Sequence, residues 1–89
     1  MKVSGRIKMK IKILLFAHLR DFVGAKTIEM EVPAEINVAG LKELLVRVYP
    51  RMLQAQNSML TAINGEYASD QQVIPLNAEI ALFPPVSGG

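Results

Sequence analysis

Only one segment of this chain has the spacing of an amphipathic helix of several turns, and strand-like segments flank it on both sides. Apolar residues recur at three- and four-residue intervals between Asn37 and Tyr49. Asn37 is a favourable N-cap residue, and Pro50 ends the helix. A single amphipathic helix buries one apolar stripe, so it needs a sheet to pack against. The sequence therefore predicts one α+β domain.

The flanking segments alternate between apolar and polar residues, as strands do. Residues 9–16 become apolar on both faces toward their end, which is typical of a central strand, and residues 26–32 form a strand that Pro33 ends. Residues 17–24 form a short helical turn that Gly24 stops. Residues 60–64 lead into Asn64-Gly65, a strong hairpin signal, and a short strand follows. Residues 79–83 form the last strand, so the order predicts a β-grasp fold with a mixed sheet of about five strands.

Charge divides the chain into an extension, a domain and a tail. The net charge is +2, but three of the ten basic residues precede a second methionine, Met9, so seven basic residues face eight acidic ones beyond it. We interpret residues 1–8 as a disordered extension, a vector remnant or a mistaken start, residues 9–83 as the domain, and residues 84–89 as an extended tail. The alternative is that the extension binds an acidic partner.

Composition excludes several classes of function. Cysteine is absent, which removes disulfides, thiolate nucleophiles and thiolate metal sites, and it favours a reducing compartment such as the cytoplasm. The longest apolar run, residues 13–17, is too short to span a bilayer, and no export signal follows the basic start. Because the basic excess belongs to the extension, we expect neither a nucleic-acid partner nor a membrane partner.

Groups that support catalysis are sparse. His18 is the only histidine, and Glu29 and Glu31 lie on the solvated face of a strand. No nucleophile-elbow motif and no glycine-rich phosphate loop is present. We expect no metal, no bound cofactor and no catalysis by this chain alone. Phe16 and Phe83 face away from the inward sides of their strands, where either a second layer covers them or they form an apolar patch for a partner.

The last seven residues, FPPVSGG, predict an arm that enters another protein. Pro84 and Pro85 fix the exit from the last strand, and six extended residues span about 20 Å. Gly88 and Gly89 have no Cβ, so they can pass through a narrow channel. The terminal carboxylate is ionised at neutral pH and can attack the α-phosphate of ATP to form an acyl adenylate. The alternative is a tail that merely frays.

Two motifs carry a resemblance to a known family. ILLFAHLRDFVG at 13–24 and IALFPPVSGG at 80–89, supported by AINGEY at 62–67, are similar to the small, sulfur-carrier subunit of molybdopterin synthase, which has the ubiquitin-like β-grasp fold. The resemblance covers residues 9–89. Residues 1–8 have no counterpart in the family pattern.

This resemblance implies a sulfur carrier that is not an enzyme by itself. An adenylating enzyme of the ubiquitin-activating type would use ATP to adenylate Gly89, and a sulfur donor such as a cysteine desulfurase or rhodanese would convert it to a thiocarboxylate. The large subunit would then pass the sulfur to cyclic pyranopterin monophosphate within a heterotetramer. Gly88 would allow passage of the tail. The residues that would contact the partners are Phe16, Phe83, Pro84, Pro85, Val86 and Ser87.

Three other functions stay open at this point. A sulfur carrier for thiazole synthesis or tRNA thiolation shares the Gly-Gly terminus but is not expected to carry FPPVSGG. A covalent protein modifier would end in an isopeptide bond from Gly89 to a lysine. A non-catalytic β-grasp interaction module would bind through Phe16 and Phe83 and would survive loss of Gly89.

Overall fold

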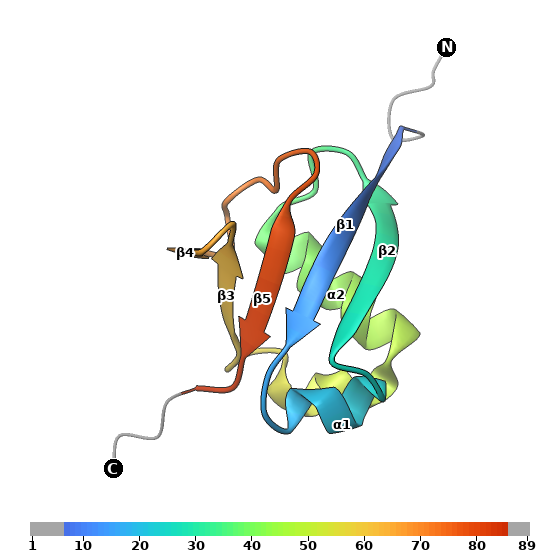
Figure 1. Ribbon diagram of the computed structural model, residues 1–89, viewed down its shortest axis with the longest axis vertical. Helices are drawn as coiled ribbons and strands as arrows, with labels where there is room; N and C mark the ends of the chain where they lie inside the picture. The colour runs from blue at the N-terminus through green and yellow to red at the C-terminus, as the bar shows by residue number, and fades with distance from the viewer. Residues whose placement is uncertain (1–6, 86–89) are drawn as a thin grey trace.

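A computed structural model of the chain describes residues 7–85. Five strands form one mixed sheet in the order β2-β1-β5-β3-β4, with β1 and β5 parallel and the other neighbours antiparallel (Figure 1). The elements are β1 (Lys8–Leu15), α1 (Leu19–Val23), β2 (Thr27–Pro33), α2 (Val38–Val48), the 3₁₀ helix η1 (Pro50–Ala55), β3 (Leu60–Ile63), β4 (Glu66–Ala68) and β5 (Glu79–Phe83). The predicted α+β fold with five strands and one main helix is confirmed.

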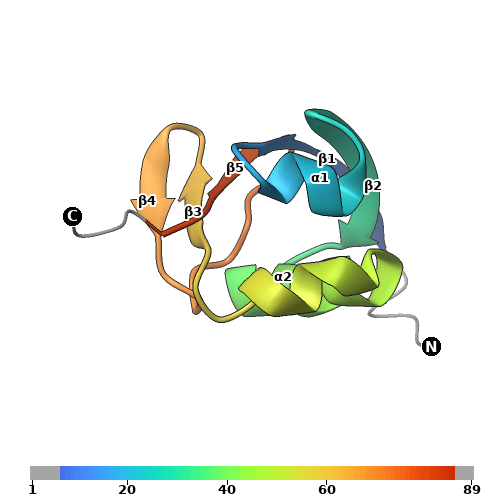
Figure 2. The same ribbon diagram turned by 90° about the horizontal axis from the view of Figure 1, so that it is seen from below.

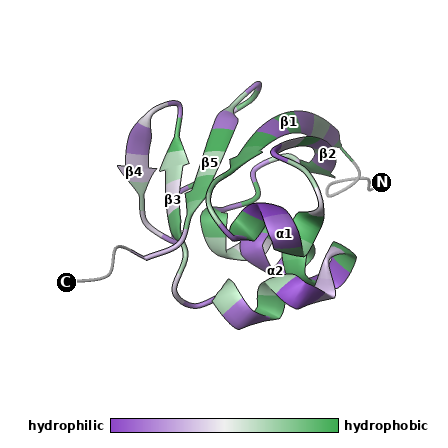
Figure 3. Cartoon of the chain, turned by 60° about the horizontal axis from the view of Figure 1, so that its bottom comes forward, coloured by the Kyte–Doolittle hydropathy of each residue, from purple (hydrophilic) through white to green (hydrophobic). Residues whose placement is uncertain are grey.

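Helix α2 begins and ends as its sequence predicts. The Asn37 side chain accepts a hydrogen bond from the Gly40 backbone N–H at 2.8 Å, which satisfies one of the unpaired donors of the first turn. Val38, Leu41 and Leu45 are fully buried, whereas Glu43 and Arg47 are exposed, so hydropathy alternates along the helix (Figure 3). This apolar stripe packs the helix across the sheet.

The helices and the core lie on one side of the sheet. Figure 2 shows α1 and α2 on the same face. Ile11, Ile13 and Leu15 of β1 and Ile80 and Leu82 of β5 point into this layer and are almost completely buried. Within residues 7–85 no helix covers the opposite face, which we call the open face. No helix in the described part of the chain is long and apolar enough to cross a membrane.

The start of the sheet reaches into the predicted extension. Lys8 is the first residue of β1, and the Ile7 carbonyl accepts a hydrogen bond from the Ala34 backbone N–H at 2.9 Å. Two residues that we assigned to the extension thus take part in the β1–β2 ladder, because the antiparallel register continues to Pro33. Residues 1–6 lie outside the described residues, and their assignment stays a prediction.

The segment after α2 contains an element that the apolar pattern did not indicate. Residues 50–55 form η1, with Pro50 at its first position, where a missing N–H costs nothing. Met52 and Ala55 are buried against the core. Their spacing of three residues matches a 3₁₀ helix, and these two short turns close one end of the helix layer.

Candidate functional site

The most chemically distinctive surface lies where the tail leaves β5. The parallel pairing of β1 and β5 brings the C-terminal ends of both strands together. The Phe16 backbone N–H donates to the Leu82 carbonyl at 3.1 Å and holds Phe16 beside the end of β5. The rings of Phe16 and Phe83 then stack, with centroids 4.6 Å apart and planes 18° apart. Both side chains are half-buried.

The β3–β4 hairpin adds two further apolar side chains to this surface. Leu60 lies directly opposite Phe83 in the β3–β5 register and is 38% exposed. Asn64 and Gly65 both have positive φ, which gives the tight turn that the sequence predicts and sets Tyr67 opposite Ala62. Tyr67 is 72% exposed, and its ring centroid is 6.2 Å from that of Phe83. We call Phe16, Leu60, Tyr67 and Phe83 the exit patch.

A cationic side chain borders the exit patch. Arg20 of α1 donates from Nε to the Leu15 carbonyl at 2.9 Å, which fixes the guanidinium near the end of β1. Its Cζ atom lies 5.9 Å from the centroid of the Phe16 ring, within the range of a cation–π contact. The patch therefore has an apolar centre and a positive rim, a combination that suits an apolar partner surface bordered by acidic groups.

An ion pair with a buried lysine and a half-exposed aspartate lies behind the patch. Lys42 of α2 is only 8% exposed, and its Nζ donates to Asp70 Oδ1 at 2.9 Å and to the Met59 carbonyl at 3.1 Å. These bonds tie the start of β3 and the loop after β4 to the helix. A cavity of about 450 Å³ lies beside them, bordered by Leu60, Tyr67 and the buried Thr61. Lys42 thereby positions the strand that carries Leu60.

The described residues include only part of the predicted site. Phe16 and Phe83 come together, and the helix layer lies on the other face of the sheet, so they are not covered by a second layer within residues 7–85. Pro84 is half-buried and Pro85 is exposed directly after β5. Val86, Ser87, Gly88 and Gly89 lie outside the described residues. The described part of the chain holds no group of three or more side chains suited to bind a metal.

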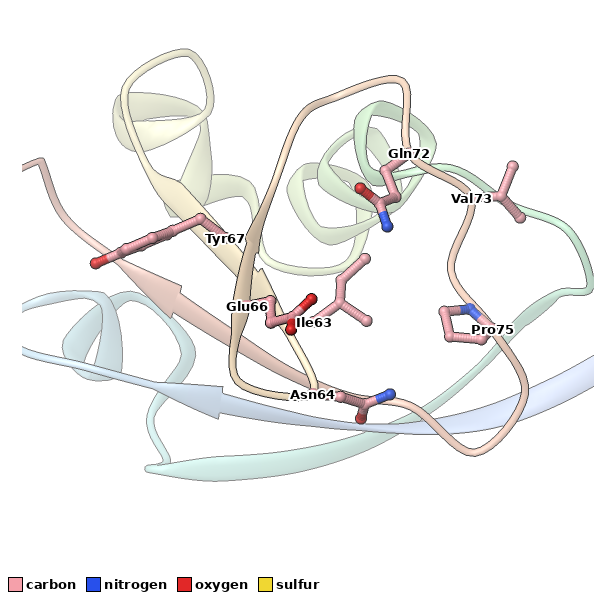
Figure 4. Close-up of a pocket in the computed structure, with 7 residues that line it drawn as sticks. All are labelled: Ile63, Asn64, Glu66, Tyr67, Gln72, Val73 and Pro75. Carbon is pink, nitrogen blue, oxygen red and sulfur yellow. The ribbon is translucent and has the colours of Figure 1, made fainter.

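A second hollow lies on the other side of the β3–β4 hairpin. It has a volume of about 510 Å³ and is bordered by the hairpin and residues 72–75. In Figure 4, Ile63, Asn64, Glu66 and Gln72 surround this hollow, while the Tyr67 ring points away from it. Tyr67 thus borders this hollow as well, while its ring lies toward Phe83 in the exit patch.

Sequence reasoning missed Leu60 and Tyr67. The Asn64-Gly65 turn does fix the hairpin register, so the sequence alone could place Ala62 opposite Tyr67. The order of strands in the sheet is what brings this hairpin beside β5 and Phe83, and no local pattern encodes that order. The sequence therefore indicated the pairing within the hairpin, but it did not indicate that the hairpin lies beside β5.

The comparisons with known proteins agree with this geometry. The ThiS family model matches residues 13–89, which is most of the chain and includes all four residues of the exit patch. The chain belongs to the ThiS family. The family match confirms that the motifs at both ends of the domain indicated a real relationship, and it covers the last residues of the sequence as well.

Several ThiS-like proteins are similar over nearly the whole chain. A molybdopterin synthase sulfur carrier subunit from Dictyostelium discoideum is 37% identical over 83 residues, covering 90% of this chain and 96% of that protein. The small archaeal modifier protein 1 of Haloferax volcanii is 25% identical with a TM-score of 0.76, covering 88% of this chain and 99% of that one. A complex of subunits 1 and 2 of the molybdopterin-converting factor from Helicobacter pylori contains a chain with the same fold, at 16% identity and a TM-score of 0.64, covering 91% of this chain and 100% of that one.

Proposed function

We propose that this chain is the sulfur carrier subunit of a molybdopterin synthase. The observation that carries the proposal is the family match over residues 13–89 together with a relative of that name that is 37% identical over almost the full length of both chains. The relative is named a carrier subunit, which agrees with a chain that does not catalyse the reaction by itself. The exit patch supplies a docking surface at the root of the arm.

The chemistry that we propose takes place at Gly89. Its carboxylate oxygen attacks the α-phosphate of ATP in an adenylating enzyme, and pyrophosphate leaves. The terminal sulfur of a persulfide on a desulfurase or rhodanese then displaces AMP to give an acyl disulfide, and a thiol reduces its S–S bond, which releases the thiocarboxylate and leaves the thiol as a disulfide. In the large subunit this sulfur passes to cyclic pyranopterin monophosphate, and water restores the carboxylate. Gly88 has no side chain that would obstruct the arm in either active site.

The geometry at the end of β5 supports an arm of this kind. Phe83 is the last residue of the sheet, and Pro84 and Pro85 have no N–H with which to extend the ladder. Six residues from Pro84 span about 20 Å when extended. The stacked Phe16 and Phe83 rings fix the starting point of the arm. A partner that covers the exit patch can therefore receive Gly89 at up to about 20 Å from the end of β5.

We propose that the large subunit binds the exit patch, because the Helicobacter pylori protein of the same fold was solved in complex with a second subunit. The adenylating enzyme would use the same patch at a different time, since both partners must receive the same arm. The heterotetramer, the sulfur donor and the cytoplasmic location stay predictions. The absence of a nucleic-acid or membrane partner also stays a prediction.

A covalent protein modifier is the second candidate. The Haloferax volcanii protein, with a TM-score of 0.76, is named a modifier, and modification would use the same activated glycine. In that case an acceptor amine, rather than a sulfur donor, would displace AMP from Gly89. The two candidates therefore differ in the species that is attached to the arm.

Mass spectrometry of the intact protein separates these functions. The full chain is incubated with its adenylating enzyme, ATP and a sulfur donor, and then with the large subunit and the pyranopterin precursor. We expect the mass increase that corresponds to exchange of one oxygen for sulfur, and its reversal only when both later components are present. The chain without Gly89 serves as the control and should show no increase. Attachment to lysines instead would favour the modifier, and no change with a demonstrably active enzyme would leave only an interaction module.

A further inference from the structure

A second apolar surface lies at the far end of the sheet from the tail. A groove of about 360 Å³ is bordered by Ile7 just before β1, Met9 of β1, Ala34 after β2, and Val73, Pro75 and Leu76 before β5. Three of its side chains are strongly exposed, namely Ile7 at 67%, Val73 at 54% and Leu76 at 71%. Because β1 and β5 are parallel, this groove at the start of β1 is separated from the exit patch by the length of the sheet (Figure 1).

The backbone beside this groove has a free edge. The bond from Ala34 N–H to the Ile7 carbonyl shows that odd-numbered residues of β1 direct their backbone groups toward β2. The bonds from Lys12 to Ala78 and from Phe16 to Leu82 show that even-numbered residues direct theirs toward β5.

The β1–β5 ladder begins only at Lys12, so β5 does not reach the first half of β1. Lys8 and Lys10 point their backbone groups toward the side that β5 leaves open. Among residues 7–85, neither makes a backbone hydrogen bond on that side. Each residue has one N–H and one C=O, so two donors and two acceptors face this gap.

These observations indicate an extended occupant with an alternating sequence. A strand added to this edge would pair with Lys8 and Lys10, and every second side chain would point to the helix side, into the groove beside Met9. The remaining side chains would lie on the open face beside the lysine side chains. Lys10 lies directly opposite Glu31, but Lys8 lies directly opposite Pro33, so no acidic residue stands directly across from the charge of Lys8.

We propose that the free edge of β1 at Lys8 and Lys10, together with the groove, binds an extended segment of a partner protein in which apolar and acidic residues alternate. A second copy of this chain is a poorer occupant, because pairing through the same edge would place lysines beside lysines. Glu35 borders the far side of the groove and limits acidic side chains to the open face. Binding there leaves the exit patch and the arm free, so a third protein could hold the carrier during sulfur transfer.

The test is a titration of the full chain, labelled with ¹⁵N and ¹³C, with a capped hexapeptide of alternating glutamate and valine. We expect shifts of the Lys8 and Lys10 amide signals, slower hydrogen exchange of both amides, and shifts of the Val73 and Leu76 methyl signals. The Tyr67 signals should not move. A peptide of the same composition with three valines followed by three glutamates should bind more weakly, because it cannot alternate between groove and open face.

Two pairs of variants test the proposal, the first by separating backbone pairing from charge and the second by testing the groove. Lys10→Pro removes one N–H on the free side without removing a bond to β2, and Lys10→Ala removes only the charge. Loss of one hydrogen bond should weaken binding by Lys10→Pro about 2- to 10-fold beyond Lys10→Ala. Leu76→Gln tests the groove at a side chain that is 71% exposed and so leaves the core intact, with Leu53→Gln as its control at a side chain that is 63% exposed on η1.

Three results would overturn the proposal. The first is the absence of any shift at Lys8, Lys10, Val73 and Leu76 up to millimolar peptide. The second is equal binding of both peptides without protection of the two amides. The third is a set of the same shifts on raising the concentration of the chain alone, which would assign the edge to a second copy.

Discussion

Replacing Tyr67 with alanine removes the most exposed ring of the exit patch and should leave the domain folded. Tyr67 is 72% exposed and touches the patch mainly through a tilted contact with Phe83 at 6.2 Å. Truncation should therefore lower the free energy of unfolding by less than about 1 kcal/mol. Any larger effect of this variant must appear in the binding of a partner.

The expected effect on partner binding follows from the exposed area. An aromatic side chain buries about 150–250 Å² in full, so covering the exposed part of Tyr67 is worth at most about 3 to 4 kcal/mol. Area converts incompletely into affinity, and we expect a loss of about 1.5 to 3 kcal/mol, or roughly 10- to 150-fold in Kd. Titration calorimetry with the large subunit of a molybdopterin synthase measures this loss.

The matched control is Leu53→Ala. Leu53 is 63% exposed but lies on η1 in the helix layer, so its truncation should change the Kd by less than about twofold. If the folded Tyr67→Ala protein binds within about threefold of the original chain, the exit patch does not dock the large subunit. The same conclusion follows if Leu53→Ala weakens binding as much as Tyr67→Ala does.

Three further predictions concern the elements that hold the site in place. Lys42→Met should lower the free energy of unfolding by about 1.5 to 3 kcal/mol, because the Met59 carbonyl loses its charged donor. Asp70→Asn should lower it by less than about 1 kcal/mol, because the Asp70 side chain is 53% exposed. Equal losses for the two variants in urea titrations would contradict this ranking. Gly65→Ala should cost about 1 to 2 kcal/mol through its positive φ alone, since a Cβ there meets no atom within 4 Å, and an unchanged Tm would show that the turn differs. Asn37→Ala should cost about 1 kcal/mol in thermal unfolding, and Asn37→Ser should restore most of it; a serine variant as unstable as the alanine variant would exclude capping as the cause.

Much of the fold was predictable because its elements have strong local signals. The Asn37 cap and Pro50 gave the limits of α2, and Asn64-Gly65 gave the hairpin and its register. The 3₁₀ helix was missed because its six residues include too few apolar residues to reveal a period. The first strand also begins one residue earlier than predicted, at Lys8 rather than Met9, because pairing with β2 rather than composition decides where it starts.

The candidate site was only partly predictable. Phe16 and Phe83 stood out because they break the inward pattern of their strands, but the adjacent Leu60 and Tyr67 depend on strand order. The burial of Lys42 was not predicted, because a lysine on a helix normally indicates a solvated position. Its burial follows from two acceptors that come from distant parts of the chain, Met59 and Asp70.

The central position of β5 has a mechanical consequence for the arm. β5 pairs with β1 on one side and with β3 on the other, and the arm begins directly after its last residue, Phe83. A pull on the arm therefore acts on two ladders at once, and it acts across their hydrogen bonds, which run roughly perpendicular to the strands in the antiparallel ladder. All of these bonds must yield together rather than one after another. An enzyme can thus draw the arm into its active site, and release it again, without unfolding the domain that carries it.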